Sequence, residues 1–112
     1  MKKILALTSL VLLSACAETS TSSPTAVDGL VGKRLVADSG TVFLINADGT
    51  MGGEFRGEPI VGTYTASATE ICSVLTAPAK IAGERCSVPV IANGTVVFNR
   101  RDGSKSAVYN IQ

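Results

Sequence analysis

The sequence predicts an all-β fold, namely a small antiparallel up-and-down barrel or sandwich of seven to eight strands with one disulfide. Short segments rich in β-branched and aromatic residues alternate with turns built on Asp-Gly or Asn-Gly. No apolar run repeats with the helical period over the length of a typical helix. These observations place one β domain at residues 30–112 of the 112-residue chain.

The first strands of this domain are expected to meander around a turn at Asp48-Gly49. Asp-Gly supplies the positive φ angles that a tight hairpin turn requires. A second turn is expected at Gly57-Glu58-Pro59. The expected strands are residues 41–46, 51–56 and 60–66.

The last strands are expected to repeat this design. Asn93-Gly94 opens a strand at residues 95–100, residues 101–104 turn, and residues 105–111 close the sheet. The phrases FLINADGT and VFNRRDGS resemble one another. One shared turn type explains this likeness.

Alternation along the strands predicts the core. Phe43 and Ile45 should point to one face of their strand and Val42 and Leu44 to the other, because neighbouring side chains alternate. Both sets are apolar, so this strand is expected to be covered on both faces or to lie centrally. The other inward-facing candidates are Phe55, Tyr64, Val96, Phe98, Tyr109 and Ile111.

The composition changes between Cys72 and Cys86. Residues 77–83 are expected to form one helical turn, because proline suits the first position of a helix and glycine suits its exit. We expect this insert to be the contact surface of the domain. The candidate contact residues are Pro78, Lys80, Ile81, Glu84 and Arg85. The alternative interpretation is a plain connection between two strands.

The first fifteen residues have the layout of a signal peptide, in which Lys2 and Lys3 precede an apolar run. This run is shorter than the roughly 20 residues that a membrane-spanning helix needs. The segment Leu13-Ser14-Ala15-Cys16 resembles the lipobox of bacterial lipoproteins, whose chain is cut before the cysteine. The alternative is an ordinary secretory signal that is cleaved elsewhere.

The resemblance implies a lipid anchor on Cys16. Bacterial lipoproteins carry a diacylglyceryl group, and usually an amide-linked acyl chain such as palmitate, on this cysteine. Two or more chains bind a membrane stably where one does not. Ala17 replaces the aspartate that favours the inner membrane, so we expect the outer membrane, facing the periplasm, with the inner membrane as the alternative. Residues 16–29 are rich in Ser and Thr and are expected to be a disordered tether.

Lipidation of Cys16 leaves Cys72 and Cys86 as the two thiols of the mature chain. Small exported domains in oxidising compartments use disulfides to compensate for a thin core, so we expect these two residues to be paired. The alternative is a redox or metal pair. Their spacing does not suit a C-x-x-C motif, and two thiols without histidine cannot complete a tetrahedral zinc site.

Charge and composition exclude several classes of function. Removal of residues 1–15 leaves eight basic and nine acidic side chains, a net charge of −1 that offers no basic field for nucleic acid. Histidine is absent, so no Ser-His-Asp or Cys-His site can form. We therefore expect no enzyme, no cofactor and no metal. The acidic residues Glu54, Glu58, Glu70 and Glu84 are interpreted as solvated loop charges.

The mature sequence is similar to small single-disulfide β lipoproteins of Gram-negative bacteria. The phrases that carry the similarity are LVGKRL, FLINADGTMGGEF, IVGTY, TAPAKIAG between the cysteines, and VVFNRRDGS. Inhibitors of secreted metalloproteases and lipoprotein inhibitors of lysozyme have comparable size and architecture. The chain lacks the tryptophan-rich strands of the first group and the Ser-Gly-x-x-Tyr stretch of the second, so no inhibitory residue is carried over.

Together these features predict a lipid-anchored, non-enzymatic envelope protein that binds a protein or a small ligand, or has a structural role. An exposed apolar patch larger than a few hundred Å² would favour binding, as would an open apolar cavity. The second expectation is an inhibitor of a secreted protease or lysozyme.

Overall fold

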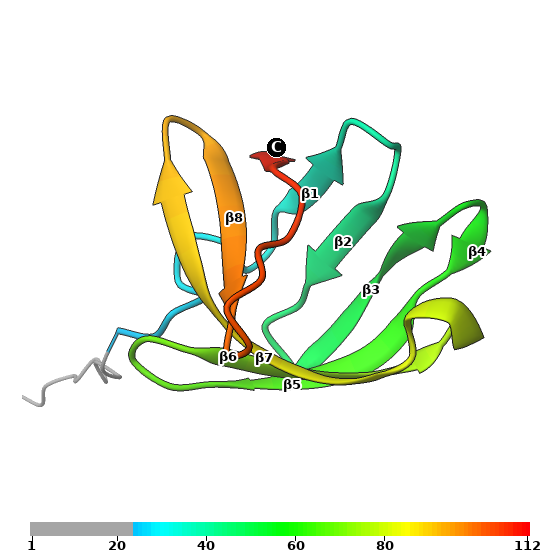
Figure 1. Cartoon of the computed structure of the whole chain (residues 1–112), viewed down its shortest axis with the longest axis horizontal. Coiled ribbons are helices and arrows are strands. Elements are labelled where there is room, and N and C mark those ends of the chain that lie inside the picture. The colour runs from blue at the N-terminus through cyan, green and yellow to red at the C-terminus, as the bar shows by residue number, and fades with distance from the viewer. Residues whose placement is uncertain (1–23) are drawn as a thin grey trace, which may run out of the picture.

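The computed structural model describes residues 24–112, which form a closed antiparallel barrel of eight strands with one extra strand (Figure 1). The predicted all-β class is confirmed, and the architecture is the barrel. The strands are β1 (Arg34–Ala37), β2 (Val42–Ile45), β3 (Thr50–Phe55), β4 (Glu58–Pro59), β5 (Val61–Ala66), β6 (Ile71–Ala77), β7 (Gly83–Ala92), β8 (Thr95–Arg100) and β9 (Tyr109–Ile111). The expected signal peptide, Cys16 and most of the expected tether lie outside the described residues.

The barrel closes through pairings between β1, β2, β3 and β9. β1 pairs with β2 on one side and with β9 on the other, and β2 also pairs with β3. Each of β6, β7 and β8 pairs with the strands next to it in sequence, and β5 pairs with β6 and β3. The extra strand β4 pairs with the end of β3, whereas β5 pairs with its start. Closure leaves the eight barrel strands without a free edge.

The two Asp-Gly turns have the same geometry, so one turn type does explain their sequence likeness. In each turn the glycine N–H, of Gly49 or Gly103, donates to a carbonyl three residues earlier, at 3.2 and 3.0 Å. In each turn the aspartate accepts bonds from the residue after the glycine. Only the glycines have positive φ, 91° and 92°, so the expectation of positive φ at Asp48 is wrong. The Asp48 carboxylate instead caps the turn.

The closing strand is shorter than the predicted 105–111. The Ser106 hydroxyl accepts a bond from the Phe98 N–H at 2.9 Å, and the Ser106 N–H donates to the Phe98 carbonyl at 2.9 Å. The Ser106 hydroxyl thus accepts a hydrogen bond that a backbone carbonyl would accept in regular strand pairing. Regular pairing resumes only at Tyr109, opposite Val96.

The insert between the cysteines is the tip of a long hairpin formed by β6 and β7. The short 3₁₀-helix η1 (Ala79–Ile81) confirms the expected single helical turn, although Pro78 precedes the turn instead of starting it. Pairing of β6 with β7 runs from Ile71 opposite Ser87 to the tip. Figure 1 shows this tip and β4 at the opposite end of the molecule from the blue start of the described chain.

The chain packs against the barrel from Thr25 onward, so the expected tether at residues 16–29 is wrong for its last part. Val27 is 4% exposed and Leu30 is 0% exposed, and both belong to the core. Two apolar side chains are enough to hold this segment against the barrel, because they cover apolar surface at one end that water would otherwise reach. The β domain therefore begins near residue 25, not at residue 30.

We call residues 25–31 the N-terminal plug. The Ala26 N–H donates to the Ser67 carbonyl, in the turn between β5 and β6, at 2.8 Å. Val31 forms an isolated bridge with Ile45 at the end of β2. The plug is thus held to two different strand connections, which closes this end of the barrel.

The core follows the predicted alternation. Phe43 and Ile45 face the barrel interior, whereas Val42 and Leu44 are half-buried on the outer face. Two of the other six candidates are buried, and four are half-buried against the core. These are Val96 and Tyr109, and then Phe55, Tyr64, Phe98 and Ile111.

The plug, the disulfide and this core all lie within residues 24–112. This segment therefore has a hydrophobic core of its own, as expected of a unit that folds independently. Within it, no helix has the length and apolar character needed to cross a bilayer.

Candidate functional site

An open cavity of about 190 Å³ lies inside the barrel. Most of its wall is apolar. The side chains that give it this character include Leu35, Phe43, Phe55, Leu75, Ile81 and Phe98. An apolar cavity of about 150 Å³ can bind benzene, so this volume suits a small molecule.

The cavity opens toward the end of the barrel opposite the plug. Its lining reaches Phe55 at the end of β3, Ile81 in η1 and Arg100 at the end of β8. Ile45, whose backbone pairs with Val31 of the plug, also belongs to the lining. The plug therefore closes the floor of the cavity, and the other end remains open.

Two arginines and three serines form a polar wall of the cavity. Ser73 of β6 lies opposite Arg85 of β7, and Ser87 of β7 lies opposite Arg100 of β8. Arg85 and Ser87 share one face of β7, so Arg85 and Arg100 are diagonal neighbours, a relation that puts residues about 7–8 Å apart. Ser106 completes this wall.

The guanidinium groups of the polar wall have few protein partners. Nη1 of Arg85 donates to the Ile81 carbonyl at 3.0 Å, and Nη1 of Arg100 donates to the Ser104 hydroxyl at 3.5 Å. Neither arginine forms an ion pair with any residue between 24 and 112. Since a guanidinium carries five N–H donors, most donors of both groups are available to a ligand or to water.

Tyr109 also lines the cavity. Its ring contacts the rings of Phe43 and Phe98 edge to face, with centroids 5.7 and 6.0 Å apart. Burial raises the pKa of Tyr109, while the charges of Arg100 and Arg85 act in the opposite direction. The field of both guanidinium groups therefore reaches the cavity interior.

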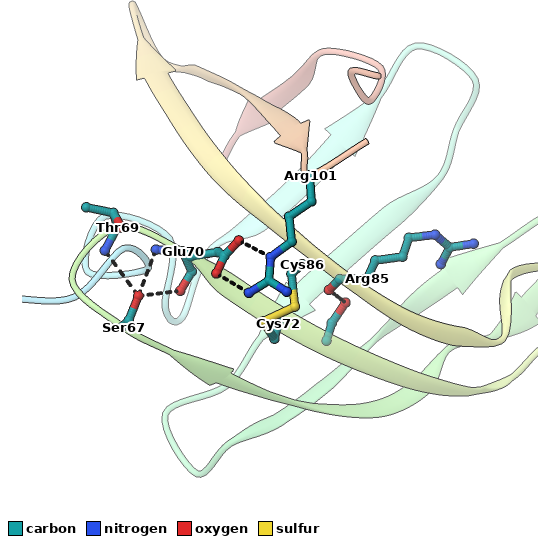
Figure 2. The surroundings of a disulfide bond; sticks show 8 residues. Ser67, Thr69, Glu70, Cys72, Arg85, Cys86 and Arg101 are labelled. Carbon is teal, nitrogen blue, oxygen red and sulfur yellow. Dashed lines mark hydrogen bonds and ion pairs between the residues drawn. A yellow bond between two sulfur atoms is a disulfide. The ribbon is translucent and has the colours of Figure 1, made fainter. Parts of the chain in front are cut away.

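Cys72 and Cys86 form the predicted disulfide, with an S–S distance of 2.08 Å (Figure 2). They lie directly opposite each other in β6 and β7. Their neighbours Ser73 and Ser87 face the cavity, so the disulfide lies on the outer face of the barrel. The Glu70 carboxylate lies close to both sulfur atoms, but a metal site is ruled out here because the sulfurs are bonded to each other and are not thiolates.

Glu70 is not the solvated loop charge that was expected. Its carboxylate accepts two bonds from Arg101, at 2.7 Å from Nε and 2.8 Å from Nη2. The hydrogen bond from Arg101 lowers the pKa of Glu70. Figure 2 shows Arg101 reaching Glu70 beside the disulfide, while Arg85 extends away from this cluster. The other three expected loop charges, Glu54, Glu58 and Glu84, are exposed as predicted.

The five candidate contact residues have three different environments. Pro78 is buried, and Lys80 and Glu84 are exposed. Ile81 and Arg85 line the cavity. The insert is therefore partly the rim of the cavity, and only part of it is an outward-facing contact surface.

Sequence reasoning missed Arg100 as a site residue and identified Tyr109 only as a core residue. A signal for Arg100 was present, because it follows Phe98 by two residues and so faces inward with it. An arginine at an inward position of a short strand indicates a polar lining.

Comparison with protein-family models, with curated proteins and with solved structures finds no match to this chain.

Proposed function

We propose that this chain is a lipid-anchored protein of the bacterial cell envelope that binds a small ligand inside its barrel and has no catalytic role. The observation that carries the binding proposal is the open cavity of about 190 Å³ with its largely apolar lining. A preformed cavity in a closed barrel loses little conformational entropy when a ligand enters.

The anchoring part of the proposal is supported by the sequence Leu13-Ser14-Ala15-Cys16 after an apolar run. Cys72 and Cys86 are bonded to each other, so Cys16 is the cysteine that remains for acylation. We place the protein at the outer membrane, facing the periplasm, because Ala17 follows the cysteine.

Ligand binding is tested with a neutral probe, hexanamide, and the purified segment 24–112 with its disulfide formed. Titration followed by amide NMR should give saturable shifts at cavity residues such as Ile71 and Leu75. The variant Ser73→Phe, which fills the cavity, should lose this binding. The matched variant Val74→Phe, on the outer face of the same strand, should keep it. No saturable shift in the wild type, or equal binding by both variants, contradicts the proposal.

Anchoring is tested in cells that express the full chain. Cys16→Ala should release the protein from the membrane fraction, and the wild type should incorporate labelled fatty acid. If the variant stays bound to membranes, or the wild type incorporates no label, the lipobox interpretation is wrong.

An inhibitor of a secreted protease or lysozyme is the second candidate, and one observation favours it. The tip of the β6–β7 hairpin carries exposed Lys80, Ala82 and Gly83, and the disulfide braces the hairpin behind it. A preorganised tip suits insertion into an active-site cleft. Mixing the segment 24–112 with lysozymes and secreted metalloproteases tests this candidate, and an absence of inhibition at micromolar concentration rejects it.

A further inference from the structure

The open end of the cavity has an unbalanced positive charge. Arg85 and Arg100 both line it, whereas none of its lining residues is an aspartate or a glutamate. Within residues 24–112, the carboxylate that forms an ion pair with an arginine is that of Glu70. Its partner is Arg101, on the outer face of the barrel. The charge of the polar wall is therefore neutralised by water and ions, or by a ligand.

The polar wall places several donors on one side of an apolar space. Ser73, Ser87, Ser106 and Tyr109 line the cavity together with the two arginines. The Ser106 hydroxyl donates to the Ala107 carbonyl at 2.7 Å and the Ser73 hydroxyl to the Arg85 carbonyl at 3.5 Å, so the donors that remain for a ligand are mainly those of the guanidinium groups. Guanidinium groups bind carboxylates and phosphates through two parallel N–H donors. Such a wall recognises an anionic head group whose body faces the opposite, apolar wall.

We propose that the ligand of this cavity is a small amphiphile with an anionic head group, held by Arg85 and Arg100, of which a short fatty acid is the simplest example. This inference depends on the proposed function, and it adds the chemical class of the ligand. The apolar body lies against Leu35, Phe43 and Met51 on β1, β2 and β3, across the barrel from the polar wall on β6, β7 and β8. The head group lies at the open end, where Arg85 is exposed and Arg100 is half-buried.

The volume sets the size of the body. A water-sized group takes up about 30 Å³ in a liquid, so a cavity of about 190 Å³ holds about six such groups. Hexanoate therefore matches the cavity, with its carboxylate at the rim. Hexanamide has nearly the same shape without the charge, and it serves as the neutral partner.

The experiment compares hexanoate with hexanamide on the oxidised segment 24–112, by NMR titration at low ionic strength. Hexanoate should bind about tenfold more tightly than hexanamide, because in a guanidinium–carboxylate pair both partners are charged, whereas the amide is neutral. The double variant Arg85→Gln/Arg100→Gln should remove this preference, because hexanoate loses both charge interactions, whereas the uncharged hexanamide loses hydrogen bonds at most. Lys80→Gln, which removes one charge from the neighbouring tip without altering the cavity lining, should keep the preference.

The double variant changes half-buried Arg100 and could therefore lose binding through a folding defect. A single substitution at exposed Arg85 provides a second test. Arg85→Glu reverses the charge at the rim and should abolish hexanoate binding, while hexanamide binding persists. If Arg85→Glu binds neither hexanoate nor hexanamide, the result counts against the inference. A residue that contacts only the charged head group should not be needed for hexanamide binding.

The possible outcomes separate the inference from the proposed function. Equal affinity for hexanoate and hexanamide overturns the anionic class and leaves the ligand-binding barrel intact. If Lys80→Gln removes the preference for hexanoate as fully as the double variant does, the roles assigned to Arg85 and Arg100 are wrong. Binding of neither probe overturns both the inference and the proposed function.

Discussion

The two ends of this barrel are built from the same strands in opposite ways. At the plugged end, Val27 and Leu30 cover an interior in which Ile45 and Val96 are almost inaccessible to solvent. At the open end, the same interior continues as a cavity of about 190 Å³ with Arg85 on its wall. One end is filled with side chains, and the other leaves space.

Strand β7 illustrates the difference between the ends. Its inward positions near the hairpin tip are Arg85 and Ser87, which line the cavity. At its other end, Ile91 lies close enough to the plug that a Cβ on Gly29 would be 3.2 Å from its Cδ1 atom. The closely packed end stabilises the fold. The open end is less closely packed, and the unfilled space there can accept a ligand.

The largest expected effect is at the plugged end. Leu30→Ala removes a fully buried side chain and should lower the free energy of unfolding of residues 24–112 by about 3–4 kcal/mol. Urea denaturation measures this loss. The matched variant at the open end, Ile81→Ala, should cost about 1 kcal/mol or less, because this side chain is only half-buried. Equal losses would remove the distinction between the two ends.

Removal of the disulfide should have the next largest effect. Cys72→Ala/Cys86→Ala reopens a loop with a sequence separation of 14 residues, and in the chain-entropy model such a loop stabilises by about 3 kcal/mol. The β6–β7 hairpin carries the rim of the cavity, so amide exchange should rise most at its tip and least in the plug. A uniform rise along the chain would contradict this localisation. The oxidised parent should show no free thiol in residues 24–112.

The titration of Tyr109 should report the charges of the open end. Its folded pKa is raised by burial, so its contribution to stability is complete below its ordinary value of 10.0 and is lost as pH rises through the folded pKa. Arg85→Gln/Arg100→Gln should raise this pKa further, because both guanidinium groups lower it. Ultraviolet titration of phenolate in a Tyr64→Phe background measures the shift. An unchanged or lowered pKa would show that the two charges do not reach the cavity.

The smallest expected effect is at the ion pair on the outer face, away from both ends. The folded pKa of Glu70 is lowered, so its contribution to stability is present above the ordinary value of 4.5 and is lost as pH falls through the folded pKa. Glu70→Gln should reduce stability slightly at pH 7 and leave it unchanged well below the folded pKa, because solvent screens an exposed pair. Urea unfolding at both pH values measures the difference. Glu54→Gln, at an exposed residue without an ion pair, is the control.

Much of the fold could be predicted from local sequence. The Asp-Gly and Asn-Gly turns were identified because their residues bond within a few positions, as the Asp48 and Asp102 caps do. The length of the closing strand was not predictable, because the Ser106 hydroxyl bonds to the Phe98 N–H across the turn, and strand patterning does not reveal a side chain in the ladder. The plug was missed because Val27 and Leu30 belong to a core that includes residues far along the chain, such as Ile71 and Val96.

Less of the candidate site could be predicted. Arg85 and Ile81 were identified as contact residues of a loop, and their place in the cavity wall was not. Arg100 lies opposite Ser87 in the hairpin of β7 and β8, but its side chain meets that of Tyr109, on β9, only in the cavity.

The sequence by itself determined the strands, the turns, the inward faces and the pairing of Cys72 with Cys86. Each of these depends on neighbouring residues or on counting cysteines. Only the tertiary structure decided that β1 pairs with β9 to close the barrel, that the plug fills one end and that the other end stays open. The physical reason is that alternation determines which way a side chain points, whereas the register of distant strands determines whether opposing side chains meet.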